Sequence, residues 1–226
     1  HPQRSVVTIH DLGYRFFPSA YRWGELLYLR LSTWFSARFS SHLLADSQAT
    51  KQDLMVYLGV AEEKVTVVYP GVDEAFSPQV DPQRLAQVRA RYGLPQDYLL
   101  HLGTVKRRKN LARLLTAYAK LWGEGLEVPL VVAGRADRLK SVLGGLPPHL
   151  RGGVDGVIFT GFLPEEDVPP LLQGATALVI PSLFEGFGLP ALEAMACGTP
   201  VVAANTSSLP EVMGDAGVLV NPMSVE

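Results

Sequence analysis

The sequence predicts an α/β protein with two doubly wound, parallel-sheet domains, of which the N-terminal one is incomplete. Short apolar runs rich in valine and isoleucine alternate with helical patterns along the 226 residues. Such runs are typical of strands buried on both faces of a parallel sheet. The hydrophobic content of 47% supplies enough apolar side chains for real cores.

The first predicted domain, residues 1–75, is the later part of a sheet domain. Its predicted strands are Val6–Ile9, His42–Ala45 and Val65–Val68, and its predicted helices are Tyr21–Ser40 and Ala49–Leu58. Ser47 is a suitable N-cap for the second helix. We expect the aromatic side chains of the first helix to face the core. Residues 76–95, which contain three prolines and a Gly-Leu-Pro stop, are predicted to be a linker.

The second predicted domain, residues 96–226, repeats the alternation more completely. Its predicted strands are Tyr98–Leu102, Leu130–Ala133, Val157–Phe159, Ala177–Ile180, Val201–Ala203 and Val218–Val220. Predicted helices lie between them, at Leu111–Trp122, near Leu139, at Val168–Gln173, at Ala191–Ala196 and near Glu211. Six strands make a nearly whole doubly wound domain, whereas three make only part of one. We expect the closing helices at the C-terminal end to be missing.

Composition excludes several classes of protein. A formal net charge of -2 argues against a general polyanion binder, so we expect no nucleic-acid partner. The single cysteine, Cys197, excludes an internal disulfide framework and fits a reducing, cytoplasmic compartment. No apolar stretch reaches the length of a bilayer span. Because the chain begins at His1 and enters a strand-like run almost at once, we expect a fragment of a longer protein.

Residues 181–200 carry most of the chemical information. Two carboxylates, Glu185 and Glu193, flank a glycine-bearing turn that opens a short helix. Gly186 and Gly188 let the backbone approach a ligand, and the free N–H groups at the helix start favour an anion. Carboxylates would repel phosphates, so each glutamate suits the neutral hydroxyls of a ribose or a hexose. The alternative is that Glu193 complements the helix dipole and Glu185 is a solvated loop charge.

Two further features lie where predicted strands end. Four consecutive basic residues, 106–109, follow the first strand of the second domain, at the edge where doubly wound sheets place ligands. They could also form a solvated face or a nucleic-acid patch, and the slightly negative net charge argues against the patch. His10 and Asp11 follow the first predicted strand in the same way. A lone histidine there is often a structural or solvated residue.

The sequence EGFGLP at residues 185–190, followed by EAMACGTPVV at 193–202, resembles the signature of the retaining glycosyltransferases of family 4. These are the group 1 glycosyltransferases, which have the GT-B fold of two Rossmann-like domains. Other matching segments follow in the same order over nearly the whole chain: HDL at 10–12, ADS at 45–47, VYPGVD at 68–73, LGT at 102–104, RKN at 108–110, FTG at 159–161 and SLPEV at 208–212. The order and spacing make the resemblance specific.

The resemblance implies transfer of a hexose, with mannose slightly favoured, from a nucleotide-diphosphate sugar to a saccharide or lipid-linked acceptor. It implies these catalytic residues: His10, Arg108, Lys109 and Glu185. It implies these residues for the nucleotide sugar: Gly103, Thr104, Gly161, Phe162, Gly186, Phe187, Gly188, Leu189 and Glu193. Thr104 stands where many similar enzymes have an arginine, so only a hydroxyl is available there.

The resemblance also implies a role for each group. Lys109, Arg108 and the N–H groups of residues 187–189 would stabilise the departing diphosphate. Glu193 would bind the ribose, Glu185 the donor sugar, and residues 161–162 the base through backbone contacts. In similar enzymes the histidine that matches His10 faces the sugar.

No metal or other cofactor is expected. The Asp-x-Asp motif that holds a divalent cation in glycosyltransferases of the other common fold is absent from the sequence. The one acidic cluster, residues 165–167, is typical of a helix N-terminus. The basic run at 106–109 can replace a cation in offsetting the charge of the leaving group.

Two alternatives to a transferase remain at this point. A sugar-nucleotide epimerase with the GT-B fold would share the donor domain, and a non-catalytic fragment would only bind the nucleotide sugar. Because the site needs both domains, we expect residues 1–226 alone to transfer no sugar.

A peripheral membrane contact that engages a lipid-linked acceptor is compatible with the transferase, since residues 1–51 hold six Arg and Lys against three Asp and Glu.

Overall fold

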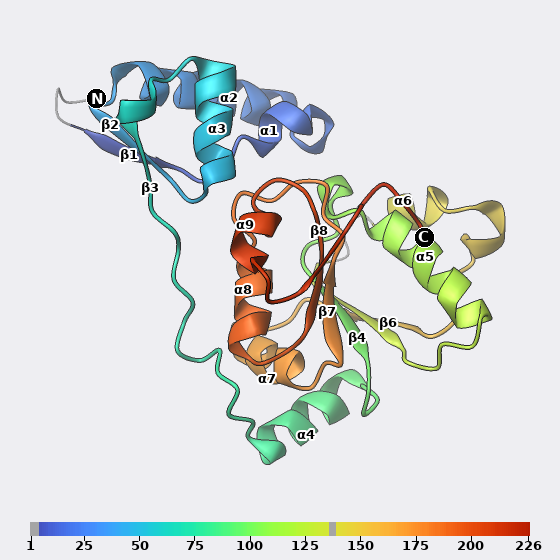
Figure 1. Ribbon diagram of the computed structural model, residues 1–226. Helices are drawn as coiled ribbons and strands as arrows, with labels where there is room; N and C mark the ends of the chain where they lie inside the picture. Colours follow the sequence, from blue (N-terminus) through green and yellow to red (C-terminus); the bar gives the residue numbers. More distant parts are fainter. Residues whose placement is uncertain (1–4, 136–138) are drawn as a thin grey trace. The chain divides into compact units, whose positions relative to one another are not determined.

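The computed structural model describes residues 5–135 and 139–226, which contain two parallel sheets in two compact units (Figure 1). Unit 1 consists of the chain up to Gly71 together with Phe184–Gly188 and Thr206–Val212. Unit 2 consists of Val72–Leu183, Leu189–Asn205 and Met213–Glu226. Two short segments of the second predicted domain thus belong to the first unit.

Unit 1 is built on a three-stranded sheet in the order β1-β2-β3. Its elements are β1 (Val6–Ile9), α1 (Gly13–Phe16), α2 (Trp23–Phe39), β2 (His42–Ala45), α3 (Gln48–Leu58) and β3 (Val65–Val67), with α9 (Leu209–Met213) near the end of the chain. Helices α2 and α3 both cover the sheet face that carries Leu43 and Val65, against which Ala37 and Leu54 pack. The predicted strands are confirmed, whereas α1 was not predicted.

The aromatic side chains of α2 do not face the core, so that prediction is wrong. Trp23 is 80% exposed and Trp34 is 53% exposed. The buried residues of α2 are small ones, Thr33, Ser36 and Ala37. Leu26 and Leu29 pack against the core of unit 1 but are only partly buried, and the aromatic side chains lie on the other side of the helix. A pattern of apolar residues alone does not reveal this inversion.

Helix α3 has the ends that its sequence predicts. The Ser47 side chain accepts a hydrogen bond from the backbone N–H of Thr50, which confirms the N-cap. Gly59 follows the last turn with a φ of 62°, the left-handed conformation that glycine adopts without strain.

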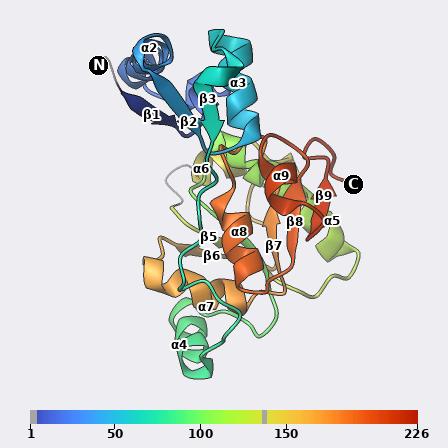
Figure 2. The same ribbon diagram turned by 60° about the vertical axis from the view of Figure 1, so that its left-hand side comes forward.

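Unit 2 contains a six-stranded parallel sheet in the order β6-β5-β4-β7-β8-β9. Its strands are β4 (Leu99–Leu102), β5 (Leu130–Ala133), β6 (Val157–Gly161), β7 (Ala177–Ile180), β8 (Val201–Ala204) and β9 (Val218–Val220). Its helices are α4 (Pro82–Tyr92), α5 (Leu111–Gly123), α6 (Leu139–Gly144), α7 (Val168–Gln173) and α8 (Leu189–Ala196). Helices α5 and α6 cover one face of the sheet, and α7 and α8 the other (Figures 1 and 2).

This order confirms the doubly wound prediction and locates its switch point. The strand order reverses between β4 and β7, which are hydrogen-bonded neighbours. Doubly wound sheets bind ligands outside the carboxyl ends of the strands at such a point. The basic run at 106–109 follows β4, and the turn that leads to Glu185 follows β7.

The second half of the predicted linker is a helix. Asp81 caps the N-terminus of α4 by accepting hydrogen bonds from the N–H groups of Gln83 and Arg84, and Gly93 ends the helix with a φ of 62°. Helix α4 packs against α7. The contact centres on Asp167 in the 3₁₀ turn Glu165–Asp167, whose carboxylate is buried and bound by three side chains of α4: Arg84, Arg91 and Tyr92.

Candidate functional site

Lys109 lies directly against the glycine that ends β4. Gly103 has a φ of 146°, and a Cβ built on it would lie 3.3 Å from Cε and 3.5 Å from Nζ of Lys109. The lysine is 8% exposed. A buried ammonium therefore lies at the switch point of the sheet, where it can act on an anion with little screening by water.

Glu193 lies in α8, within electrostatic range of Lys109. Burial, followed by the negative charge of Glu165, raises the pKa of the Glu193 carboxyl above its ordinary value, and the positive charge of Lys109 opposes that shift. Unit 2 therefore brings together three of the predicted site residues: Gly103, Lys109 and Glu193. The carboxyl is partly buried and so suits a hydroxyl partner better than a second anion.

The ends of β4, β5 and β6 form one edge with little room for side chains. The N–H of Gly103 donates to the carbonyl of Ala133, and the N–H of Gly134 donates to the carbonyl of Gly161, both at 2.9 Å. A Cβ on Gly134 would lie 2.3 Å from the Gly103 carbonyl oxygen. A glycine after β5 is therefore required for this close approach. It was not among the predicted site residues.

Phe162 follows β6 and is 68% exposed. The guanidinium carbon of Arg135 lies 5.6 Å from the centre of this ring. Gly161 precedes it with a φ of 74°. This pair makes an open, flat surface of the kind on which a planar ring can stack. Arg135 carried no motif that could have identified it from the sequence.

Arg108 and Thr104 lie in the same connection after β4. The carbonyl of Arg108 accepts a hydrogen bond from the N–H of Leu183 at 2.7 Å, which joins the basic run to the turn after β7. Both side chains are half-buried. Of the basic run, Lys106 and Arg107 are exposed, so only part of it is a solvated face.

In unit 1, His10 lies at the carboxyl end of β1 and pairs with Asp46. The distance between His10 Nδ1 and Asp46 Oδ2 is 2.7 Å, and the histidine side chain is 79% exposed. Nearby, Asp11 accepts a hydrogen bond from the N–H of Gly13 at 2.7 Å. Burial and the charge of Asp11 raise the pKa of Asp53, in α3, to about 6.

The segment Phe184–Gly188 lies against His10 within unit 1. A Cβ on Gly186 would lie 2.7 Å from the His10 carbonyl oxygen, so this position requires glycine. The Ser47 hydroxyl donates to the Gly186 carbonyl at 2.7 Å. Unit 1 therefore brings together two of the predicted site residues, His10 and Gly186.

Two serines that the sequence did not identify as site residues support this loop. The backbone N–H of Glu185 donates to Ser207 Oγ at 2.8 Å, and Ser208 Oγ lies 3.0 Å from the Glu185 carbonyl and 2.6 Å from the Phe187 carbonyl. Glu185 itself is 5% exposed, so its interpretation as a solvated loop charge is wrong. The S-L-P-E segment at 208–211 was the available signal for this support.

Of the remaining predicted residues, Phe187 is near Tyr69, with 5.8 Å between ring centres. Gly188 has a φ of 107°, and Leu189 is the first residue of α8, so the helix begins two residues before the predicted start at Ala191. The short length of α8 is as predicted.

Glu211 joins the end of the chain to the start of α3. Its two carboxylate oxygens accept hydrogen bonds from the N–H groups of Gln48 at 2.9 Å and Ala49 at 3.2 Å. A carboxylate at these otherwise unpaired N–H groups also complements the helix dipole. It therefore anchors residues 206–212 within unit 1.

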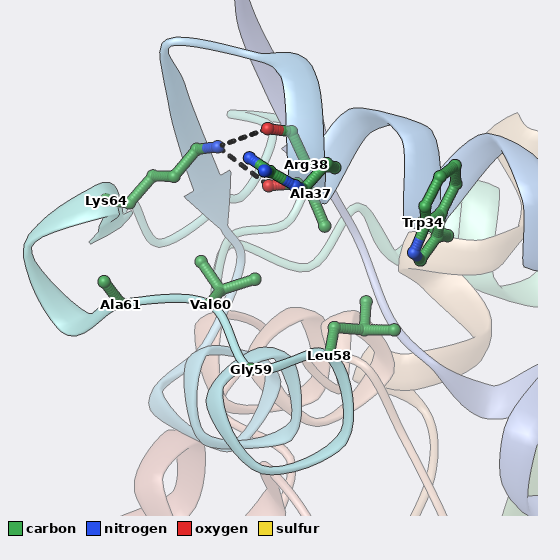
Figure 3. Close-up of a pocket in the computed structure, with 8 residues that line it drawn as sticks. All are labelled: Trp34, Ala37, Arg38, Leu58, Gly59, Val60, Ala61 and Lys64. Atoms are coloured by element: carbon green, nitrogen blue, oxygen red, sulfur yellow. Dashed lines mark hydrogen bonds between the residues drawn. The ribbon is translucent and has the colours of Figure 1, made fainter.

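A pocket of about 290 Å³ lies elsewhere in unit 1, between the second half of α2 and the residues after α3 (Figure 3). Trp34 and Arg38 line it from α2, and Leu58 and Lys64 from the other side. The Lys64 ammonium donates to the carbonyls of Ala37 at 2.7 Å and Arg38 at 3.4 Å, so it caps the end of α2. None of the predicted site residues is among those that line this pocket.

In the part of the chain that the structure describes, no group of three or more histidine, cysteine, aspartate or glutamate side chains could hold a metal ion. Over residues 5–135 and 139–226, no helix combines the length and the apolar character that crossing a bilayer requires.

Two family models and several known proteins match this chain. The family model described as "Glycosyl transferases group 1" matches residues 96–226, and the model described as "Glycosyltransferase Family 4" matches residues 1–76. The chain is 34% identical to the O-antigen chain mannosyltransferase B of Escherichia coli, over 99% of the chain and 59% of that protein. It is also 34% identical to the GDP-mannose-dependent alpha-(1-6)-phosphatidylinositol dimannoside mannosyltransferase of Mycobacterium tuberculosis, over 94% of the chain and 54% of that protein.

Among solved structures, the chain is similar to that of the Anabaena protein HepE in complex with UDP and glucose. The TM-score is 0.78 with 25% sequence identity, over 98% of this chain and 59% of the other. The chain thus spans little more than half the length of these relatives.

Proposed function

Since the chain belongs to the group 1 glycosyltransferases of family 4, with a GT-B fold, we propose that the whole protein is a retaining mannosyltransferase. Its donor would be a nucleotide-diphosphate sugar, with GDP-mannose favoured, and its acceptor a saccharide or a lipid-linked saccharide. The observation that carries this proposal is the buried Lys109, which lies over Gly103 at the switch point and within electrostatic range of Glu193. The Lys109 ammonium can bind a diphosphate, and the nearby Glu193 carboxylate can accept hydrogen bonds from the hydroxyls of the ribose joined to it.

Each group has a proposed part in the transfer. As the bond between the sugar and the diphosphate breaks, negative charge grows on the leaving phosphate. Lys109, Arg108 and the N–H groups of residues 187–189 would offset that charge. Glu193 would accept hydrogen bonds from the ribose, and Phe162, beside Arg135, would contact the base. Glu185 and His10 would act on the sugar, with His10 oriented by Asp46.

The test measures transfer of radiolabelled sugar from GDP-mannose, with UDP-glucose and UDP-galactose in parallel, to saccharide and lipid-linked acceptors. We expect GDP-mannose to give the fastest transfer and the largest thermal stabilisation. A ligand at 100 times its Kd stabilises a protein by about 2.7 kcal/mol, which a thermal shift detects. Absence of both transfer and stabilisation with all donors would contradict the proposal. Release of an epimer without acceptor would favour the epimerase, for which the named relatives offer no support.

We also expect the transfer to need no metal ion, because Lys109 and Arg108 supply the positive charge that a cation would provide. Transfer should therefore keep its rate in excess EDTA. Loss of activity with the chelator, followed by recovery on adding Mg²⁺ or Mn²⁺, would contradict this prediction. A metal-dependent glycosyltransferase assayed in the same buffer is the control.

The outer face of α2 supports a second part of the proposal, a peripheral contact of the cytoplasmic protein with an anionic membrane. We define this face by its exposed residues, which are Trp23, Leu27, Tyr28, Leu31, Trp34, Phe35 and Phe39. Arg22 at the N-cap and Arg30 and Arg38 within the helix are also exposed, and Glu25 is the acid of this helix. Tryptophan and tyrosine favour the headgroup region, and arginines are attracted to anionic lipids.

Vesicle sedimentation tests this contact. The protein should bind vesicles of phosphatidylglycerol and phosphatidylcholine more strongly than vesicles of phosphatidylcholine alone. Each basic residue contributes about 1 kcal/mol near an anionic surface, so the double change Arg30→Gln and Arg38→Gln should lower the binding by about 30-fold. Val56→Ser, at an exposed apolar residue of α3, is the control. Equal binding of parent and double variant, or self-association through this face instead, would contradict the proposal.

A further inference from the structure

Asn110 lies between the basic run and helix α5, in a conformation that few residues adopt. It follows the 3₁₀ turn Arg107–Lys109 and precedes the first residue of α5 with a φ of 59°. An asparagine before a helix usually accepts a hydrogen bond from the first turn, but the Asn110 side chain makes no such bond. It is 8% exposed, so its amide has partners elsewhere in the protein.

The side-chain amide of Asn110 binds two other segments at the edge of the sheet. Its Nδ2 donates to the carbonyl of Pro181, just after β7, at 3.1 Å, and to the carbonyl of Pro222, after β9, at 2.8 Å. The Oδ1 accepts from Nη1 of Arg113 at 3.0 Å, which fixes which end of the amide faces the carbonyls. Arg113 Nη1 also donates to the Pro222 carbonyl at 3.2 Å.

These bonds join the turn that carries Lys109 to the turn that leads into Glu185. The bond from Asn110 to Pro181 and the bond from the Leu183 N–H to the Arg108 carbonyl link the same two segments on both sides of Lys109. The two segments follow β4 and β7, the strands on either side of the switch point. The turn from Pro181 to Leu183 is therefore held at a fixed spacing from the turn that carries Lys109.

We infer that Asn110 is a positioning residue for diphosphate recognition, which acts by holding the Lys109 turn against the turn after β7. This inference rests on the proposed function. The Lys109 ammonium can bind a phosphate tightly only if its backbone is held in place, because misplacement by about an ångström already weakens binding and slows the reaction. The positive φ of Asn110 does not require these side-chain hydrogen bonds, and helix capping does not involve them. Their common effect is to join the segments of Pro181, Pro222 and Arg113.

The test compares Asn110→Asp with the parent protein. Aspartate has nearly the same shape and tolerates positive φ, but its carboxylate oxygens cannot donate to the Pro181 and Pro222 carbonyls. Calorimetric titrations with GDP, GMP and guanosine, and with the matching uridine ligands, separate the diphosphate from the rest of the nucleotide. We expect affinity for the diphosphate to fall at least tenfold, while affinities for the monophosphate and nucleoside stay within about twofold.

Two further variants keep the inference falsifiable. Asn110→Gly retains the backbone conformation without the amide and should show the same selective loss. Asn221→Asp, at an exposed asparagine whose Oδ1 accepts a bond from the N–H of Met223, is the control and should bind all ligands as the parent does. Unchanged diphosphate affinity in Asn110→Asp, or an equal loss for all ligands together with a lower Tm, would overturn the positioning role. If the parent binds no nucleotide diphosphate, the proposed function fails, and this role fails with it.

Discussion

Replacing Lys109 by alanine should weaken the binding of GDP by roughly 10- to 150-fold, the loss expected when one charged hydrogen bond worth about 1.5 to 3 kcal/mol is removed. Lys109 is 8% exposed and its side chain lies against Gly103, so water does not replace the ammonium easily. Transfer should slow further, by about 10²- to 10³-fold in kcat, because charge on the leaving diphosphate peaks in the transition state. Calorimetry measures the first effect and a radiolabel transfer assay the second.

Lys106→Ala is the matched control, because this lysine belongs to the same basic run but is exposed. It should bind GDP within about twofold of the parent, since exposed charges are screened. Gly103→Ala should reproduce part of the Lys109→Ala loss, since its Cβ would press on Lys109 Cε. Equal affinities in the parent and in Lys109→Ala would remove the central claim about this site.

Removing Lys109 should also affect Glu193. The positive charge of Lys109 counteracts the rise in the pKa of the Glu193 carboxyl that burial and Glu165 cause. Without the lysine, Glu193 should hold its proton to a higher pH. A protonated carboxyl has less capacity to accept hydrogen bonds from ribose hydroxyls. The two residues should therefore show non-additive effects in a double-mutant cycle of nucleotide binding.

The sequence predicted the sheets well because their signal is local. Strands such as β5 (Leu130–Ala133) and β7 (Ala177–Ile180) are short apolar runs between turn residues, and alternation with helices then determines a parallel, doubly wound order. The same order places the basic run at the ligand edge before any side chain is seen. The family resemblance, rather than the strand order, singled out Lys109 within this run and joined it to Glu193 in one predicted site.

Other features depend on partners that are distant in the sequence. Glu211 binds the N–H of Gln48, 163 residues away, and no local pattern connects them. The orientation of α2 was predicted wrongly because apolar periodicity does not reveal which face approaches the sheet. Helix α4 had the signals of a helix, Asp81 at the N-cap with Pro82 after it and Gly93 at the end, but the surrounding prolines favoured a linker.

Replacing Asp167 by asparagine should lower the free energy of unfolding by about 3 kcal/mol, because breaking a buried ion pair leaves its partners uncompensated. The carboxylate is fully buried and accepts bonds from Arg91 at 2.7 Å and Tyr92 at 2.5 Å, with Arg84 as a third partner. The side chains of Arg84 and Arg91 are partly exposed, at 31% and 52%, so water can reach them in the variant. The decrease in the free energy of unfolding should therefore not exceed about 3 kcal/mol, and urea unfolding at pH 7 measures this decrease.

The pH dependence of this difference distinguishes an ion pair from simple packing. Burial alone would raise the pKa of Asp167, but the bonds from Tyr92 and Arg91 and the charges of Arg91 and Arg84 lower it below 3.8. A carboxyl with a lowered pKa stabilises the fold above its unfolded-state pKa, and this contribution is lost as the pH falls through the lower, folded-state value. The difference in free energy of unfolding between the parent and Asp167→Asn should therefore be largest at pH 5 to 7 and should decrease below about pH 4.

Glu166→Gln, at the exposed neighbour, is the control and should unfold like the parent at every pH. A difference in free energy of unfolding that stays constant down to low pH, or one below about 0.5 kcal/mol at pH 7, would show that Asp167 does not hold α4 through its charge.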